Sequence, residues 1–272
     1  MKSRIITSLI GVPLIFSVLI SFVLMKIFIF LLMIFSLYEI FQMSKLKEKS
    51  YIYISSLLIV IVFIFSVLFN SKFTETLIGF ITLSSFMLLM FLIFNNWDLK
   101  EKIKSLRYQK NSTYIFFISI LYFSLVLIHL ILLRNQSEGF KLLIYILVIT
   151  FSVDTFSYFI GSLIGRRREN FLSLISPNKT IEGTLGGFLI GFVCSIILSR
   201  ILEINGDWIT LVIISILIPF FAITGDFLQS GLKRFYGAKD SGGTLPGHGG
   251  FLDRIDSLGL SAYSYYWILV FL

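Results

Sequence analysis

Charged residues are scarce in this sequence: only 14% of its 272 residues are Asp, Glu, Lys or Arg, whereas 57% are hydrophobic. A soluble domain of this length could not bury so much apolar surface, so the composition excludes a soluble globular protein. The single cysteine, Cys194, excludes a disulfide framework and a thiolate metal site. We interpret it as a small core residue. Two histidines, His129 and His248, with no cysteine near them, offer no zinc set.

Long apolar segments dominate the sequence instead. A helix of about 20 apolar residues crosses the hydrocarbon layer of a bilayer. By this length we predict nine spans at residues 5–25, 27–43, 51–69, 76–94, 114–133, 142–164, 185–204, 208–224 and 251–272. The predicted fold is all-α, a polytopic transmembrane helical bundle. Because no small-residue cleavage pattern follows the first apolar stretch, we expect that span to be retained.

The basic residues are distributed unevenly between the two sides of this predicted bundle. Eighteen of the 23 Lys and Arg residues fall in the loops of one side. Short cytoplasmic loops carry the excess of positive charge, so we predict that the N-terminus and the loops after the sixth and eighth spans are cytoplasmic. The net charge of +8 then needs no nucleic-acid partner, since such loops face anionic headgroups or an anionic substrate.

The loop after the eighth predicted span is rich in glycine and in cations. Seven glycines lie between Gly231 and Gly250, together with Lys233, Arg234 and Lys239. Glycine lets backbone amides approach an anion closely, and Lys and Arg bind phosphate oxygens. An ordinary flexible, positively charged cytoplasmic loop would have a similar composition. Glycine and lysine content alone therefore leaves both interpretations open.

Three carboxylates accompany this loop. Asp253 and Asp256 are three residues apart at the head of an apolar helical segment, so they share one face. Asp226 ends the preceding predicted span, and the connection is long enough to fold back and bring it near the pair. Grouped carboxylates suit a hard cation such as Mg²⁺. A helix dipole would explain Asp253 or Asp256 singly, but not Asp226 at a helix C-terminal end.

Other polar residues admit two interpretations each. Asp154 lies about ten residues inside a predicted span, which indicates a functional site or aqueous cavity, the alternative being an interhelical hydrogen bond. His129 is interpreted as a satisfied interhelical donor. His248, between two glycines, either contacts phosphate or acts as a general acid, or else folds the loop.

The loop after the sixth predicted span contains SPNKTIEG, in which Lys179 is surrounded by Ser176, Asn178, Thr180 and Glu182. This segment fits a second contact to a phosphate or lipid headgroup. Helix capping and positive-inside anchoring would produce a similar pattern.

These segments together resemble a known family. The stretch SGLKRFYGAKDSGGTLPGHGGFLDRID, residues 230–256, is similar to the C-terminal signature of phosphatidate cytidylyltransferases, also called CDP-diacylglycerol synthases. The resemblance continues in D-T-x-x-Y-x-x-G from Asp154 to Gly161 and in S-P-x-K-T-x-E-G from Ser176 to Gly183. It covers about the last 120 residues, and the first 140 match only in hydropathy. Gln229 stands where the family often has Glu, and Phe156 and Ser157 follow D-T where it has small residues.

The resemblance implies condensation of CTP with phosphatidic acid to CDP-diacylglycerol and pyrophosphate, the committed step of phospholipid biosynthesis, with magnesium and room for a second cation. It implies catalytic roles for Asp226, Asp253, Asp256, Lys233, Arg234 and His248. The three acids among them would be the metal ligands. It implies substrate contacts for Lys179, Ser176, Thr180, Lys239, Asp240, Arg254 and Asp154.

The resemblance also sets the expected organisation. Residues 1–140 would form a membrane scaffold that faces lipid or an oligomer partner, and residues 141–272 a catalytic region with two cytoplasmic active-site loops. The expected setting is the bacterial plasma (inner) membrane, with a homodimer compatible with the family and no nucleic acid involved.

Two alternatives stand beside this prediction. A related CTP-dependent enzyme could act on another lipid, such as an isoprenoid alcohol or a lipid phosphate. A cation-coupled transporter would explain Asp154 and the glycine-rich backbone. Against the transporter, the glycine cluster is predicted outside the bilayer, and no paired discontinuous helices recur in two halves.

Overall fold

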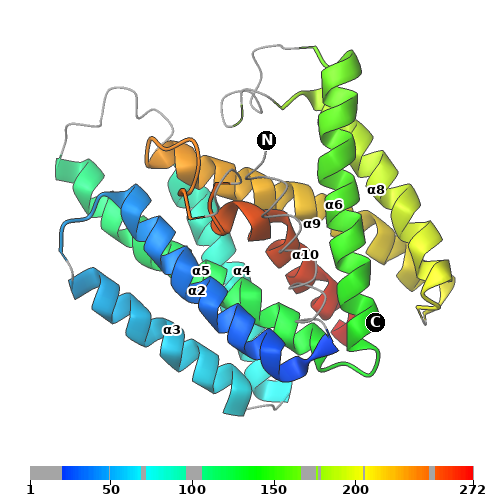
Figure 1. Cartoon of the computed structure of the whole chain (residues 1–272), viewed down its shortest axis with the longest axis horizontal. Coiled ribbons are helices and arrows are strands. Elements are labelled where there is room, and N and C mark those ends of the chain that lie inside the picture. Colours follow the sequence, from blue (N-terminus) through cyan, green and yellow to red (C-terminus); the bar gives the residue numbers. More distant parts are fainter. Residues whose placement is uncertain are drawn as a thin grey trace. The chain divides into compact units, whose positions relative to one another are not determined.

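The computed structural model describes residues 20–48, 50–68, 72–95, 106–166, 176, 179–204, 206–244 and 249–271. These residues form eight helices (Figure 1), which confirms the all-α prediction. They are α2 (Phe22–Ser44), α3 (Ser50–Leu68), α4 (Lys72–Asn95), α5 (Leu106–Arg134), α6 (Gly139–Ile164), α8 (Ile181–Ile201), α9 (Trp208–Phe235) and α10 (Leu252–Phe271).

Seven of the helices that the structure describes, α2 to α9, are long and apolar enough to cross a membrane. They match the second to eighth predicted spans one for one. Most of the first predicted span, residues 5–19, lies outside the described residues. The ninth forms α10, which begins with Asp253, Arg254 and Asp256 and is not one of the seven. The predicted number of nine is therefore approximate.

The start of α2 differs from the prediction. Lys26 was expected to separate two spans, but it lies inside α2, whose first turn is capped by Ser21 through a 3.4 Å bond from the Leu24 amide. The Lys26 ammonium group lies 4.2 Å from the centroid of the Phe22 ring. A long lysine side chain can cover apolar surface in this way without ending a helix.

The C-terminal end of α9 also differs. The eighth span was predicted to end at residue 224 and to give way to a loop, but α9 continues to Phe235. Leu228, Leu232 and Phe235 are buried at helical spacing, so the apolar face continues after the first acid. That prediction is wrong because the end of an apolar run marks where a helix can leave lipid, and the buried Leu228, Leu232 and Phe235 keep the helix going beyond it. Asp226 and Lys233 therefore lie on helix, not loop.

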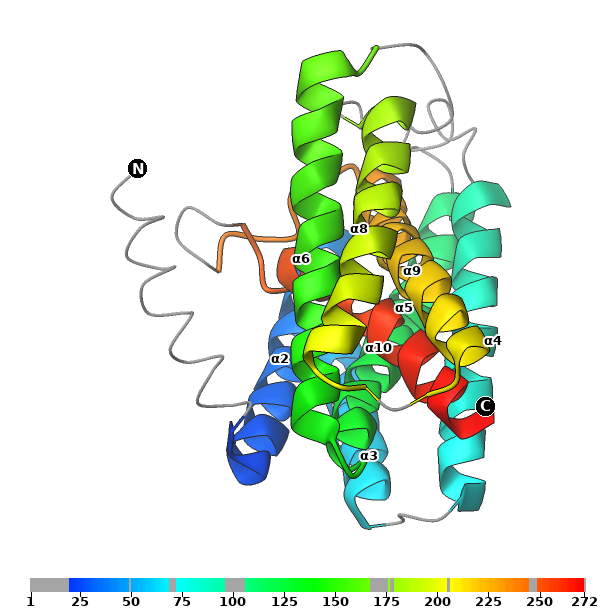
Figure 2. The ribbon, with the colours of Figure 1, turned by 90° about the vertical axis from the view of Figure 1, so that its right-hand side faces the viewer.

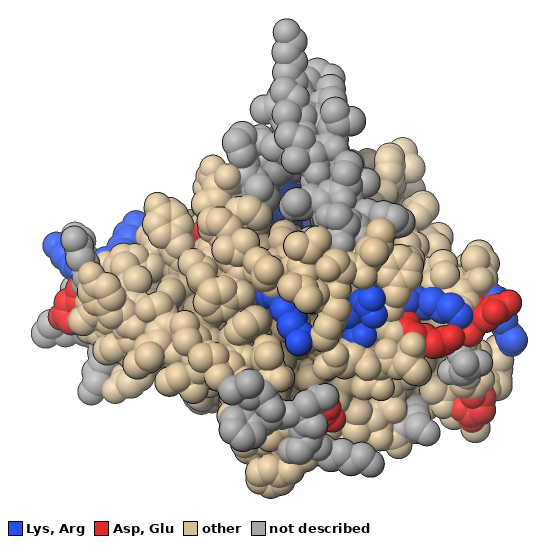
Figure 3. All heavy atoms as spheres, turned by 60° about the horizontal axis from the view of Figure 1, so that its bottom comes forward, with Lys and Arg blue, Asp and Glu red and all other residues tan. Residues whose placement is uncertain are grey.

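The chain divides into two compact units, each assembled from separate segments. The first unit comprises Met1–Ile128 and Leu232–Arg254, and the second comprises His129–Gly231 and Ile255–Leu272. These units are defined by contacts within the fold, whereas the division at residue 140 was predicted from function, so that division stays a prediction. In the first unit, α2 packs beside α3, with the Phe30 and Phe63 rings 4.9 Å apart. Uncharged side chains dominate the face drawn in Figure 3, as expected for helices in lipid.

In the second unit, α6 and α8 run side by side in both ribbon views (Figures 1 and 2). The buried face of α8 repeats a small residue every fourth position: Gly183, Gly187, Gly191, Ser195 and Ser199. Small residues let membrane helices approach closely. Tyr145 of α6 donates to or accepts from Ser195 Oγ at 2.6 Å, and Ser195 Oγ lies 2.9 Å from Ser215 Oγ of α9. These bonds join three helices.

The interpretation that His129 makes an interhelical hydrogen bond is confirmed. This histidine is buried in α5, and its Nε2 accepts a 3.2 Å bond from Trp267 Nε1 of α10. The imidazole thus acts as acceptor in this bond, whereas a donor was expected.

Replacing Gly187 with alanine is expected to destabilise the second unit. An added Cβ would lie 1.9 Å from Ser157 Oγ and 2.6 Å from the Val153 carbonyl oxygen. Alanine gains about 1 kcal/mol of helix propensity, but overpacking against a backbone atom costs about 1–3 kcal/mol or more. The midpoint of thermal unfolding in detergent should fall by several degrees. Gly206→Ala is the control, since the nearest atom to its Cβ would be 3.6 Å away. An unchanged midpoint for Gly187→Ala would contradict the close packing.

Candidate active site

The last turn of α9 carries two of the predicted phosphate-binding cations, Lys233 and Arg234. The helix ends in a turn at Gly237, whose φ of 69° favours glycine, and the Ala238 amide donates to the Lys233 carbonyl at 2.8 Å. Arg234 Nη1 donates to the Ala238 carbonyl at 3.1 Å. Cations at this position also complement the negative end of the helix dipole.

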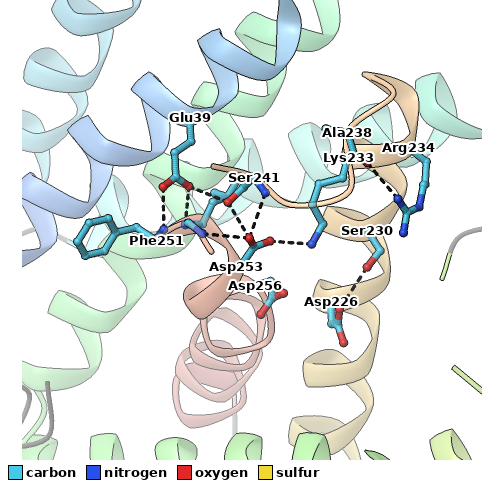
Figure 4. A network of polar contacts seen from close by, with 12 residues as sticks. Glu39, Asp226, Ser230, Lys233, Arg234, Ala238, Ser241, Phe251, Asp253 and Asp256 are labelled. Atoms are coloured by element: carbon cyan, nitrogen blue, oxygen red, sulfur yellow. Dashed lines mark hydrogen bonds and ion pairs between the residues drawn. The ribbon is translucent and has the colours of Figure 1, made fainter. Parts of the chain in front are cut away.

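Lys233 meets Asp253, which lies 20 residues later in the first turn of α10 (Figure 4). Lys233 Nζ lies 2.7 Å from Asp253 Oδ1. Asp253 Oδ2 accepts bonds from the Ser241 amide at 3.0 Å and from the Gly250 amide at 3.2 Å. Burial raises the pKa of the Asp253 carboxyl, but the Lys233 charge and these hydrogen bonds outweigh burial and lower the pKa below its usual range.

Glu39 of α2, which the sequence analysis did not single out, belongs to the same network (Figure 4). Its carboxylate is fully buried and accepts bonds from the Phe251 amide at 2.8 Å and the Leu252 amide at 2.9 Å. It also accepts bonds from Ser241 Oγ at 2.8 Å and from Thr244 Oγ1. An acid inside a predicted span was the available signal, the same one that drew attention to Asp154.

A second acid–lysine pair lies in the second unit. Lys179, just before α8, forms an ion pair with Asp226 of α9, and its ammonium group lies 4.7 Å from the Phe227 ring centroid. Asp226 Oδ1 also accepts a 3.3 Å bond from Ser230 Oγ, one helical turn later. The pair is partly exposed, with 28% of the Lys179 side chain and 22% of the Asp226 side chain accessible. Both groups can therefore reach a ligand.

Asp154 and Asp256 are joined through one hydroxyl in the second unit. Ser257 Oγ lies 3.0 Å from Asp154 Oδ2 and 3.2 Å from Asp256 Oδ1. The helices that carry Asp226 and Asp256 also touch, because a Cβ added to Gly225 would lie 2.4 Å from the Asp256 carbonyl oxygen. The interhelical bond anticipated as an alternative for Asp154 is therefore present, and its predicted substrate role stays a prediction.

The remaining predicted site residues lie at the start of α8 or on the surface, apart from His248. Thr180 is the N-cap of α8, with its Oγ1 3.1 Å from the Gly183 amide, and the Ser176 carbonyl accepts a 3.0 Å bond from the Lys179 amide. Lys239, Asp240 and Arg254 are exposed. His248 lies outside the described residues.

The three predicted metal ligands are divided between the units: Asp253 lies in the first, and Asp226 and Asp256 lie in the second. Among the residues that the structure describes, no three His, Cys, Asp or Glu side chains are grouped to hold one ion. The donor chemistry of each acid nevertheless suits a hard divalent cation, since each carboxylate has a serine hydroxyl oxygen beside it: Ser230 at Asp226, Ser241 at Asp253 and Ser257 at Asp256. The ammonium groups of Lys179 and Lys233 form ion pairs with Asp226 and Asp253, so both carboxylates attract positive charge.

The chain belongs to the Cytidylyltransferase family, whose model matches residues 2–272. It is similar to curated proteins named phosphatidate cytidylyltransferase. One from Staphylococcus epidermidis is 38% identical over 124 residues, which cover 46% of this chain and 47% of the relative. One from Bacillus subtilis is 37% identical over 153 residues, 56% of each chain. One from Staphylococcus aureus is 37% identical over 124 residues, 46% of this chain and 47% of the relative. The chain spans about half the length of the curated relatives it matches. The seven apolar helices found in the described part of the chain make it an integral membrane protein.

Proposed function

We propose that this protein is a phosphatidate cytidylyltransferase, which condenses CTP with phosphatidate to give CDP-diacylglycerol and pyrophosphate. One observation carries the proposal beyond family membership. Each of the two polar motifs contributes a lysine, predicted to bind phosphate, that forms an ion pair with an acid predicted to bind metal. Lys179 pairs with Asp226, and Lys233 pairs with Asp253. Paired charges of this kind suit a site that receives both an anion and a cation.

The two substrates fit the setting of these residues. Phosphatidate carries two acyl chains and approaches from the bilayer, whereas CTP is a soluble polyanion. Lys233 and Arg234 end an apolar helix, and Asp253 begins α10, so the polar groups lie where the chain leaves its apolar segments. The excess of basic residues in the corresponding loops supports a site that faces the cytoplasm. Location in a bacterial inner membrane and assembly as a homodimer are expectations from the family resemblance.

In the proposed reaction, a phosphate oxygen of phosphatidate attacks the α-phosphorus of CTP. The new P–O bond forms as the bond between the α-phosphorus and the bridging oxygen breaks, and pyrophosphate leaves with that oxygen. Two anions must approach each other, so the chain contributes mainly charge neutralisation and in-line positioning. Lys233 and Lys179 are flexible point charges that can move from a carboxylate to a phosphate oxygen, and Arg234 offers a planar fork of donors.

Asp226, Asp253 and Asp256 are the acids that would serve as ligands to divalent cations, for which magnesium is the expected ion. When bound, this ion would supply charge stabilisation to the triphosphate and to the leaving pyrophosphate. Burial raises the pKa of Asp253, but the Lys233 charge, with smaller contributions from the Ser241 and Gly250 amides, outweighs burial and lowers the pKa, and the two amides fix the direction of the carboxylate. Lys239 and Arg254 are exposed, and their positive charge would attract the substrate anions.

Pyrophosphate release from CTP by purified protein in detergent–lipid micelles tests the function. We expect release to require both phosphatidate and Mg²⁺, to stop on addition of EDTA and to resume when Mg²⁺ is restored in excess. An isoprenoid alcohol and a different lipid phosphate are offered in place of phosphatidate. Release with one of these lipids and not with phosphatidate would reassign the substrate. Folded protein that releases nothing with any lipid would overturn the proposal.

A further inference from the structure

We infer that Glu39 is a positioning residue: its buried carboxylate holds Ser241, Thr244 and the start of α10 against α2 and, through Ser241, orients Asp253. The inference rests on the proposed function in that Asp253 is taken to act there. It gives α2 a direct part in building the site: the signature motifs lie in about the last 120 residues, but the family model matches residues 2–272 and so includes this helix.

The burial of Glu39 requires explanation, because an ionised carboxylate away from water is costly unless hydrogen bonds or a cation compensate it. None of the ion pairs found among the described residues involves Glu39. It is compensated by four donors instead: two on Oε1, from Thr244 and Phe251, and two on Oε2, from Ser241 and Leu252. A carboxylate has about four acceptor positions. The four donors from Ser241, Thr244, Phe251 and Leu252 match that number.

Two of those donors are backbone amides at the N-terminus of α10, from Phe251 and Leu252. The first amides of a helix lack partners within the helix, and the positive end of its dipole stabilises an anion. Glu39 therefore caps α10 from a residue more than two hundred positions earlier in the chain. The cap fixes the start of the helix whose first turn carries Asp253.

The glycines of the loop show how closely it surrounds this carboxylate. A Cβ on Gly250 would lie 2.0 Å from Ser241 Oγ and 2.4 Å from Glu39 Oε2, and one on Gly242 would lie 3.2 Å from Glu39 Cγ. Neither glycine has a positive φ, so contact with Glu39 and Ser241, and not backbone conformation, requires them. Two of the glycines for which a phosphate cradle and an ordinary loop were both open interpretations thus make room for a protein carboxylate.

The residues that hold Asp253 are the same ones that surround Glu39. Ser241 Oγ lies 2.8 Å from Glu39 Oε2 and 3.0 Å from Asp253 Oδ2, and the amides of Ser241 and Gly250 both donate to Asp253. Any movement of Ser241 and Gly250 away from Glu39 would displace both backbone amides that donate to Asp253, together with the Ser241 hydroxyl that lies between the two carboxylates. Because Glu39 is enclosed and its acceptors are filled, it acts through these neighbours and not on the substrate.

Glu39→Gln is the sharpest test, because the amide cannot satisfy this arrangement in either orientation. Whichever way it is turned, its NH₂ group faces a backbone amide donor, that of Phe251 or that of Leu252. We expect hydrogen exchange to become faster in peptides that contain residues 250–254. We also expect kcat to fall about 10–100-fold, the range for loss of an outer-shell partner, and the Mg²⁺ concentration for half-maximal activity to rise. The KM for phosphatidate should change little.

Glu48→Gln is the matched control: it makes the same change at an exposed acid, which contacts Ser50 at 3.4 Å, and should alter none of these readouts. If Glu39→Gln does not fold, Glu39→Asp is measured in the same way. It keeps the charge on a side chain one methylene shorter, so its exchange rate, kcat and Mg²⁺ dependence should change in the same directions but by less than expected for Glu39→Gln. A folded variant at residue 39 with wild-type exchange and wild-type Mg²⁺ dependence would overturn the inference. If wild-type protein releases no pyrophosphate, the proposed function fails, while the exchange comparison still decides whether Glu39 holds the loop.

Discussion

Asp253→Asn is expected to lower kcat/KM for pyrophosphate release by about 10³-fold, the scale seen when one group that stabilises transition-state charge is removed. Asparagine matches aspartate in size, but only one of its two terminal atoms accepts hydrogen bonds. With that oxygen facing the Ser241 and Gly250 amides, its NH₂ group faces the Lys233 ammonium, which now lies 2.7 Å from a carboxylate oxygen. The variant loses both the anchor for Lys233 and a charge for the cation.

The same substitution elsewhere separates this effect from a general effect of charge. Asp207→Asn removes an exposed acid that accepts a 3.2 Å bond from the Thr210 amide at the other end of α9, and its activity should stay close to wild type. Asp253→Glu keeps the charge but moves it by one methylene, so it should recover only part of the activity. A folded Asp253→Asn variant within about threefold of wild type would remove Asp253 from the catalytic machinery.

Helix positions were predictable because the code for membrane spans is local. Residues 51–69 needed only their own hydropathy to be placed as α3. The same code failed at α9, because charged residues can continue a helix that no longer faces lipid. Asp226, Ser230 and Lys233 continue α9, and the buried Leu232 between them keeps the helix packed. Hydropathy marks the membrane boundary, which is not the boundary of the helix.

The candidate site was predictable in its residues but not in its contacts. Motifs pointed to Lys179, Asp226, Lys233 and Asp253, yet no local rule says which lysine meets which acid. Those pairings span 47 and 20 residues, and they depend on how the helices pack. The role of Glu39 was still harder to predict, since its partner Ser241 is 202 residues away in the sequence. Only the cost of an acid inside an apolar helix could have drawn attention to it.

Lys179→Ala is expected to lower kcat/KM about 100-fold, mainly through a higher KM for CTP, because it removes a cation placed to hold a phosphate. Its partner Asp226 would be left partly buried without its ion pair. The stability cost should be about 1–3 kcal/mol, between that of an exposed pair and that of a buried one. Activity and thermal unfolding are therefore measured on the same preparations, together with Lys179→Arg, which keeps the charge.

Exchanging the two residues distinguishes a functional pair from a structural one. If Lys179 and Asp226 served only to join α9 to the start of α8, the double variant Lys179→Asp/Asp226→Lys would re-form the ion pair and restore both stability and activity. We expect it to recover stability and not activity, because an anion would then stand where phosphate must bind, and a cation where the divalent ion must bind. Recovery of activity in the exchanged variant would show that the pair is structural and that phosphate is held elsewhere.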